Sequence, residues 1–478
     1  MNRTPPFRYF RSSCFLPVFF LLAGCTVVGP DYFKPELPLY EWHSPLRKGL
    51  QVEQAASQQL ASWWNVLQDE QLSDLIQRAV AGNLDLQTAA ERVEQARLQR
   101  DITEAGRLPS LDASSNASLN RDGRNDSSGE SYGSLNAGWE ADLFGSVRRS
   151  VEAAEADVQA RRETLRDVLV SLTAEVALNY VELRSAQVQL ANVRKSLAMQ
   201  RETRQLVQWQ VEAGLDDELA LHQARHSLES AEAQIPALET SLTASMNRLA
   251  VLLGEQPGSL QKELDEPQPI PQIPATVAVG LPADAVRRRP DIRKAESELI
   301  AQTARVGVAM AELYPKLRLS GVIGINGISV ARFAENLFSP AFWAEQAGLH
   351  ASWHLFDAGA IRKNIAIRTS QQKQALIAYE AAVLGAMEEI ENALTAYVNE
   401  QGRRDSLAKA VQEAEQAVQL AEKKYKTGLV DFTTVLDTQR TLLSSTNQLA
   451  GSEGNMAANL IRLYKALGGG WPCCPDGV

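Results

Sequence analysis

Residues 425–440 of this chain have the sequence YKTGLVDFTTVLDTQR, and they interrupt a long stretch of helical periodicity. Gly428 can adopt the left-handed backbone conformation that ends a helix, and Asp431 can cap the helix that follows. We therefore predict that this segment is the tip of a helical hairpin, with one long helix entering it and another leaving it.

A second tip with the same pattern is predicted at residues 211–225, where Gly214 and Asp217 occupy the corresponding positions. The two tips differ in charge, because Asp437 of the later tip corresponds to Gln223 of the earlier one. We therefore expect an acidic function of the tips to belong mainly to the later one.

The two tips belong to a tandem duplication. Residues 84–111 match residues 290–317 at a constant offset of 206, and residues 214–254 match residues 428–468 at a constant offset of 214. Each copy is predicted to contain a helix, two strands, a long helix, a tip and a second long helix.

The chain divides on this basis into six segments. In order they are a signal peptide (1–24), an N-terminal segment that is expected to be acylated (25–61), the first repeat (62–255), a proline-rich linker (256–282), the second repeat (283–470) and a C-terminal tail (471–478).

The N-terminus has the form of a bacterial lipoprotein signal. Three arginines precede an apolar run, residues 15–22, that is too short to span a bilayer as a helix. The run ends in Leu-Ala-Gly-Cys, which predicts diacylation of Cys25 and cleavage just before it. Thr26 follows, where aspartate would indicate retention at the inner membrane, so we expect the outer membrane. The alternative is an ordinary secretory signal with an incidental cysteine.

Four segments alternate between apolar and polar residues with the period of a β-strand. They are residues 109–121, 132–144, 315–327 and 346–356. The alternation in each extends over about ten residues, the length that a tilted strand needs to cross a hydrocarbon layer. In a soluble sandwich the apolar face would meet a second sheet, and in an outer-membrane barrel it would meet lipid. Because four strands cannot close a barrel with a lumen, such a barrel must be shared between chains.

Composition and motifs exclude several classes of function. The formal net charge of −10 argues against a nucleic-acid partner, since nothing would neutralise the phosphates. No phosphate-binding glycine loop, nucleophile elbow or catalytic dyad occurs, so we expect neither an enzyme nor a cofactor. His222 and His226 stand four residues apart, but no further ligand completes a metal site. Cys473 and Cys474 form no disulfide framework.

Several motifs together resemble those of the TolC-like outer-membrane factors of tripartite efflux pumps, in their lipoprotein (NodT-type) branch. They are the lipoprotein box, the Leu-Pro…Arg-Arg-Pro-Asp-Ile run at 281–292, Tyr-Pro-Lys-Leu at 314–317, Leu-Phe-Asp-Ala-Gly at 355–359, the tip at 425–440 and LYKALGGGW at 463–471. The resemblance covers essentially the whole mature chain.

The resemblance implies a mostly α-helical fold with a small membrane β part. Three chains would form a 12-stranded β-barrel in the outer membrane, continuous with a 12-helix α-barrel in the periplasm. An equatorial belt, built from residues 25–61, the linker and the C-terminal region, would surround the tunnel. It also implies two protein partners, a periplasmic adaptor (membrane fusion) protein and an inner-membrane RND-type antiporter that supplies the energy. The protein would be a passive exit duct, anchored to outer-membrane lipid, with a large periplasmic part.

Site residues follow from the resemblance in the same way. In the family the tips close like an iris around rings of aspartate, and the matching positions here are Asp431 and Asp437. A neighbouring ring position, which is aspartate in other members of the family, is occupied here by Thr434. Tyr425 and Arg440 are candidates for the bonds that hold the tip shut. Asp431 also fits a simple helix cap.

The polar faces of the strands provide the candidates for residues that line the barrel lumen: Asn136, Glu140, His350 and His354. Two other functions remain open at this point. One is a pore-less periplasmic coiled-coil lipoprotein that acts as an adaptor or scaffold. The other is an outer-membrane channel for a type I protein secretion system.

Overall fold

The computed structural model describes residues 27–36, 43, 49–51, 60–121, 127–274, 276–279, 282–327 and 343–471. Cys25, Cys473 and Cys474 lie outside the described residues. Among those residues, no helix combines the length and the apolar character that a membrane-spanning helix needs.

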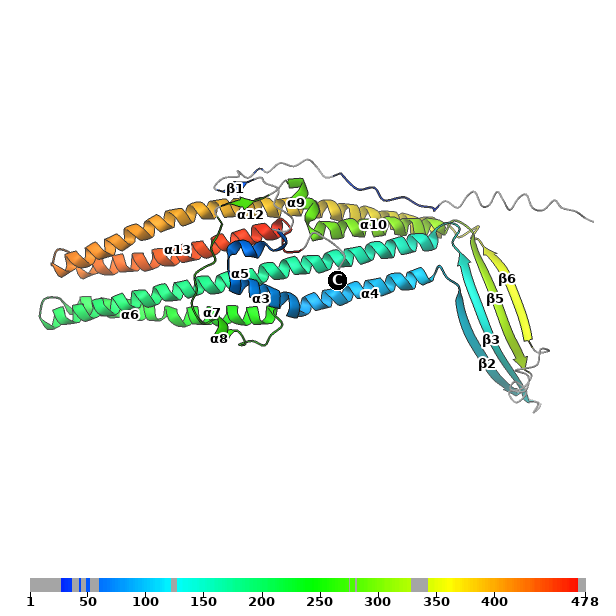
Figure 1. The fold of residues 1–478 in the computed structure, drawn as a ribbon, viewed down its shortest axis with the longest axis horizontal. Helices are drawn as coiled ribbons and strands as arrows, with labels where there is room; N and C mark the ends of the chain where they lie inside the picture. The colour runs from blue at the N-terminus through cyan, green and yellow to red at the C-terminus, as the bar shows by residue number, and fades with distance from the viewer. Residues whose placement is uncertain are drawn as a thin grey trace, which may run out of the picture. The chain divides into compact units, whose positions relative to one another are not determined.

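The chain consists mainly of helices, with one four-stranded sheet (Figure 1). The elements are β1 (Leu50–Gln51), η2 (Trp63–Leu67), α3 (Glu70–Gly82), α4 (Leu84–Ala105), β2 (Ser110–Arg121), β3 (Ser127–Ala141), α5 (Ser146–Glu212), α6 (Glu218–Glu232), α7 (Gln234–Leu252), α8 (Gln261–Leu264), β4 (Val277–Ala278), α9 (Pro282–Arg288), α10 (Pro290–Ala311), β5 (Lys316–Gly327), β6 (Trp343–Ser352), α12 (Ala360–Lys426) and α13 (Phe432–Ala466).

The bounds of these elements repeat with the offsets seen in the sequence. An offset of 206 takes α4 to α10 and β2 to β5, and an offset of 214 takes α5 to α12. The two long helices α5 and α12 contain 67 residues each. In the first copy, the second arm of the hairpin is divided into α6 and α7 just before Pro236, whose missing N–H removes a helical hydrogen bond.

The chain forms two compact units. The first contains the described parts of Met1–Pro35, Glu94–Ala160 and Ala295–Tyr379, and the second those of Glu36–Val93, Arg161–Lys294 and Glu380–Val478. The sheet therefore belongs to the first unit, and both hairpin tips belong to the second.

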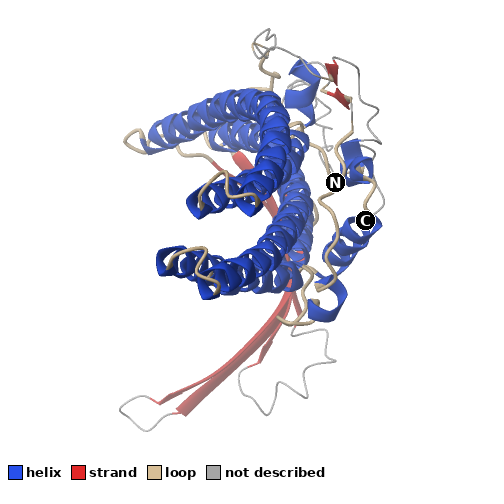
Figure 2. Ribbon diagram, turned by 90° about the vertical axis from the view of Figure 1, so that its left-hand side faces the viewer, coloured by secondary structure: helices blue, strands red, loops and turns tan. Residues whose placement is uncertain are grey.

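The sheet is fully antiparallel, in the order β2-β3-β5-β6, and Figure 2 shows it as one curved ribbon in red. The register brings odd-numbered residues together on one face, where Leu135 lies opposite Ile323 and Leu319 opposite Leu349. This face is apolar and open, and Leu349 is 68% exposed. β2 and β6 are the two edges of the sheet.

The predicted strand at 346–356 ends too late. β6 stops at Ser352, because that residue lies opposite Lys316, the first residue of β5, and later residues have no partner on β5. The predicted strand includes His354, but this residue lies in the connection between β6 and α12. Asp357 then accepts hydrogen bonds from the backbone N–H groups of Gly359 and Ile361, at 2.9 and 2.7 Å, and caps α12.

A buried arginine fastens the proline-rich linker to the helices of the second unit. Arg184 of α5 is 0% exposed, and its guanidinium donates to the side chain of Gln187 at 2.6 Å and to the carbonyl of Glu266 at 3.1 Å. It also donates to the side-chain oxygen of Gln71 in α3 and lies 4.8 Å from the ring centroid of Tyr180. One side chain thus joins α5, α3 and the linker.

Candidate functional site

The two hairpin tips have the same backbone design. Gly214 and Gly428 both have a φ of +71°, and a side chain at either would meet open space, so the glycines serve the left-handed turn rather than close packing. The carboxylate of Asp217 accepts from the N–H of Ala220 at 3.0 Å. Asp431 does the same at the second tip, and both tips therefore end and restart their helices as the sequence predicts.

A tyrosine links the second tip to the first. The hydroxyl of Tyr425 lies 2.7 Å from Oδ2 of Asp216 and 2.5 Å from Oε1 of Gln210. The hydroxyl has one proton to donate, and the carboxylate is the stronger acceptor. Burial, followed by the bond to Asp216, raises the pKa of Tyr425, so the donor stays protonated at physiological pH.

Sequence reasoning missed Asp216 and Gln210 as the partners of Tyr425. The sequence contains a feature that singles out Asp216, because the offset of 214 aligns this acidic residue with the apolar Val430 of the second copy. The first tip therefore has an acidic residue beside its capping aspartate, and the second tip does not.

Apolar packing supports this link. The ring of Tyr425 lies 5.6 Å from that of Phe432. The buried cluster around them takes side chains from both hairpins: Val207, Ala220, Ala224, Ala421, Val435 and Leu436. The two tips thus pack together within the second unit, at the end of that unit where all four helical arms turn (Figure 1).

The aspartates of the second tip differ in their surroundings. Thr434 donates its hydroxyl to Oδ1 of Asp431 at 2.6 Å and its backbone N–H at 3.1 Å, and the bond from that hydroxyl is the main reason that the pKa of Asp431 is lowered. Asp437 and Arg440 are exposed, and within the described chain their side chains make no hydrogen bond or ion pair. The structure therefore brings Tyr425 to Asp216 and not to Arg440.

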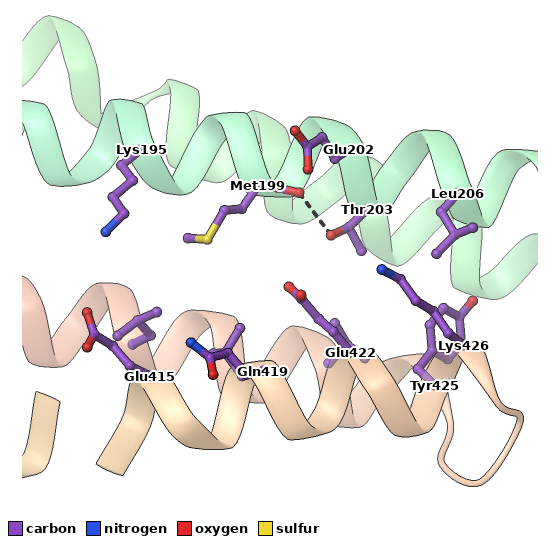
Figure 3. Close-up of a pocket in the computed structure, with 13 residues that line it drawn as sticks. Lys195, Met199, Glu202, Thr203, Leu206, Glu415, Gln419, Glu422, Tyr425 and Lys426 are labelled. Carbon is purple, nitrogen blue, oxygen red and sulfur yellow. Dashed lines mark hydrogen bonds between the residues drawn. The ribbon is translucent and has the colours of Figure 1, made fainter. Parts of the chain in front are cut away.

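A groove of about 490 Å³ runs beside the tips, between α5 on one side and α12 and α13 on the other (Figure 3). Charged side chains from both walls face it: Lys195, Glu202, Glu415, Glu422 and Lys426. Gln439 of α13 bridges the two walls, since its amide donates to Thr203 and to Glu422, both at 3.1 Å. The groove therefore carries charges of both signs on its walls.

The predicted lumen residues in the strands share the even-numbered, polar face of the sheet. Asn136 donates to the hydroxyls of Ser114 and Ser134, both at 3.1 Å. Glu140 lies opposite Arg318, which in turn lies opposite His350. The polar face therefore carries a row of titratable groups across three strands.

Comparisons with known proteins agree with this architecture. The family model for outer membrane efflux proteins matches residues 75–255 and 281–469. Nodulation protein T of Rhizobium leguminosarum bv. trifolii is 32% identical over 456 residues, which cover 94% of this chain and 96% of that protein. Cation efflux system protein CusC of Escherichia coli O6:H1 is 31% identical over 458 residues, with 94% and 96% covered.

The solved structure of the outer-membrane channel OprN superposes with a TM-score of 0.85 at 33% identity, and the match covers 93% of this chain and 99% of that one. The family match includes both copies of the duplication, with the strands and the tips. The chain therefore belongs to the outer membrane efflux protein family, and it is the outer-membrane channel of a tripartite efflux pump rather than an enzyme.

Proposed function

We propose that three copies of this chain form a passive exit duct, with a 12-stranded barrel in the outer membrane and a 12-helix tunnel in the periplasm. The observation that carries the proposal is the sheet, which exposes an apolar face and ends in two edge strands, β2 and β6. Four strands cannot enclose a lumen, since the smallest outer-membrane barrels have eight. Pairing edge to edge among three copies would complete the barrel and place the apolar face in lipid.

The described start of the chain supports Cys25 as the site of the lipid anchor. The N–H of Val28 donates to the carbonyl of Phe144 at 3.2 Å, in the turn between β3 and α5. Three residues reach at most about 10 Å. Acyl chains on Cys25 would therefore enter the membrane beside the end of the barrel, and each buried methylene would add about 0.8 kcal/mol to the attachment.

The groove beside the tips supports the proposed partners. Its charged walls and open form suit a helical hairpin of a periplasmic adaptor protein. An inner-membrane RND-type antiporter would complete the pump and supply its energy.

At the tips, the bond between Tyr425 and Asp216 would hold the periplasmic end closed. Asp431 and Asp437 would form acidic rings near the axis, three copies each. Arg440 is exposed on the helix that bears Asp437, which suits a bond to a neighbouring chain at the same level. A narrow acidic ring would attract cations and repel anions.

The function is tested in a planar lipid bilayer with the protein purified in detergent. We expect a trimer by native mass measurement and a steady conductance after insertion. Leu135→Lys should abolish insertion, because a lysine near the middle of the membrane face costs about 2–4 kcal/mol in each chain. Asn136→Lys is the matched control on the polar face, and it should still insert and conduct. A monomer without conductance, or equal insertion of both variants, would contradict the duct.

The acidic rings predict cation selectivity that depends on pH. We expect the variant Asp431→Ala/Asp437→Ala to lose cation preference in bilayer reversal-potential measurements at neutral pH. Because hydrogen bonds lower the pKa of Asp431, its charge, and its stabilising cap on α13, are present above the ordinary carboxyl pKa and are lost as pH falls through the lowered value. Thr434→Val should therefore shift the loss of selectivity to higher pH. Unchanged selectivity in the double variant would remove these residues from the gate.

A further inference from the structure

We propose that the start of α12 binds the headgroup of an anionic phospholipid from the inner leaflet of the outer membrane. Arg362 and Lys363 bind the phosphate, and the side chains of Leu355 and Phe356 contact the glycerol and acyl part of the same lipid. The inference rests on the proposed function, which places this end of the sheet at the periplasmic side of the membrane. It follows from a comparison of the two copies of the duplication.

In the first copy, residues 27–31 lie against the start of α5, and we call this segment the strap. Arg149 is 5% exposed, and its guanidinium donates to Asp31 at 2.7 Å and to two carbonyl groups of the strap. The strap also covers Gly145, because a Cβ atom built there would lie 2.7 Å from a strap side chain. The strap leads to Cys25, so the protein's own proposed lipid anchor takes this place in the first copy.

In the second copy the same place is not covered by any segment that the structure describes. The offset of 214 takes residues 148–149 to Arg362 and Lys363. It also takes Gly145 to Gly359, where a Cβ atom would meet no described atom within 4 Å. Arg362 and Lys363 are exposed, and they make no hydrogen bond or ion pair with the residues that the structure describes. The second copy thus keeps the basic pair without the strap.

The acids that accompany the basic pair in the first copy are replaced by apolar residues in the second. The two arginines of the first copy donate to Asp142 at 3.3 Å and to Glu152 at 2.8 Å. The offset of 214 takes those acids to Phe356 and Ala366. Phe356 is 90% exposed. Uncompensated cations beside an exposed apolar ring fit an anionic amphiphile, because its headgroup and its acyl chains need both surfaces.

Two other acids of the second copy lie close to the start of α12, and both are bonded to groups outside the basic pair. Asp357 accepts hydrogen bonds from the backbone N–H groups of Gly359 and Ile361. Glu312 accepts from the side chain of Asn364 at 3.4 Å. Cations in the first turn of a helix oppose its dipole, so an external anion would also relieve that repulsion.

The side chains around the pair favour a lipid over a free phosphate ion. The indole N–H of Trp353 donates to the carbonyl of Leu313 at 3.0 Å, which fixes the ring where the strand leads into the helix. Tryptophan is enriched at membrane–water interfaces. Leu355 is 79% exposed and continues the odd-numbered, apolar series of β6. A free phosphate would use the basic pair alone and leave these apolar side chains in water.

Native mass spectrometry of the detergent-purified trimer, with added phosphatidylglycerol, tests the site. We expect up to three retained phosphatidylglycerol molecules per trimer, one for each chain, and much weaker retention of zwitterionic phosphatidylcholine. Arg362→Gln/Lys363→Gln should weaken the retention of phosphatidylglycerol about tenfold or more, since each basic residue at an anionic lipid surface contributes about fivefold in affinity. Arg362→Lys/Lys363→Arg keeps both charges and should bind like the unaltered protein.

Two further variants separate the site from a general effect of charge. Phe356→Asp/Ala366→Glu gives the second copy the acids of the first and keeps the basic pair, so it should also lose phosphatidylglycerol about tenfold. Arg403→Gln/Arg404→Gln removes the same charge from the same helix, about 60 Å away, and should bind like the unaltered protein. Every variant is also measured for trimer mass and for conductance, which show that it has folded and inserted.

An acid of a neighbouring chain is the competing occupant. In the first copy Gly29 of the strap crosses α10 closely at Gly307, and the offset of 206 takes Gly307 to Asp101 of α4. In a trimer Asp101 of a second copy could face Lys363, although it already pairs with Arg100 of its own chain at 2.7 Å. Asp101→Asn and Arg362→Gln/Lys363→Gln would then destabilise the trimer equally, and neither would change lipid retention. That result would overturn the lipid site.

The remaining outcomes separate the lipid site from the duct. A conducting trimer that retains phosphatidylglycerol no better than phosphatidylcholine overturns the lipid site and leaves the duct in place. Equal retention by the unaltered protein and by Arg362→Gln/Lys363→Gln removes the basic pair from lipid binding. Full displacement of the lipid by millimolar inorganic phosphate would show that the pair binds phosphate alone, without the apolar contacts. A monomer without conductance overturns the proposed function, and the membrane placement of this site with it.

Discussion

Replacing Tyr425 by phenylalanine is expected to raise the resting conductance of the reconstituted channel at least severalfold. The ring keeps its packing against Phe432, but the hydroxyl that donates to Asp216 is lost. A hydrogen bond to a charged group is worth about 1.5–3 kcal/mol, or roughly tenfold or more in a closed-to-open equilibrium for each chain. Single-channel recording without adaptor protein measures this change directly, as the fraction of time that the channel is open.

Asp216→Asn is a comparison variant that should weaken the bond to Tyr425 without removing it. An amide oxygen still accepts from Tyr425 but is a weaker acceptor than a carboxylate, so the rise in resting conductance should be smaller. The double variant should conduct no more than Tyr425→Phe alone, because both changes act on the same bond and Tyr425→Phe already removes it. A resting conductance of Tyr425→Phe equal to that of the unaltered protein would show that this bond does not hold the gate.

Arg184→Ala is expected to destabilise the second unit by about 3 kcal/mol or more, because acceptors on three elements lose a fully buried donor. Those acceptors are the side chains of Gln71 and Gln187 and the carbonyl of Glu266. The linker should detach from α5 at the same time. Thermal unfolding in detergent, together with the rate at which a protease cleaves the linker, measures both effects.

Arg194→Ala is the matched control for Arg184→Ala. Arg194 lies on the same helix and pairs with Glu239 at 3.3 Å, but both side chains are more than half exposed. Exposed ion pairs contribute about 0–1 kcal/mol, so this variant should unfold close to the temperature of the unaltered protein. Equal unfolding temperatures for the two variants would show that the buried guanidinium does not hold the linker.

The duplication repeats the scaffold of the hairpins, but the residues of the proposed gate differ between the two copies. The bounds of the first arms, the glycine turns and the capping aspartates recur in both copies, because each copy must meet the same backbone requirements. The residues that would act at the gate differ: Asp216 corresponds to Val430, and Asp437 corresponds to Gln223. In a trimer the walls would therefore repeat six times around the axis, whereas the gate would repeat three times.

The strands show which strand bounds the local alternation predicts and which it does not. β2 and β5 begin and end within one residue of the alternating segments 109–121 and 315–327. The end of β6 was wrong because it depends on where β5 begins, and alternation in β6 carries no information about its partner. Residues 353–355 keep the alternating pattern, although β5 has no residue opposite them.

The sequence by itself determined the duplication, the tips, the alternating strands and their polar faces, because helix caps, left-handed glycines and strand periodicity act over a few residues. Only the tertiary structure decided that Tyr425 bonds to Asp216, 209 positions away, and not to Arg440 on the neighbouring helix. It also decided that Arg184 holds the linker. The physical reason is that such contacts depend on how two long hairpins pack side by side, and no local pattern encodes that packing.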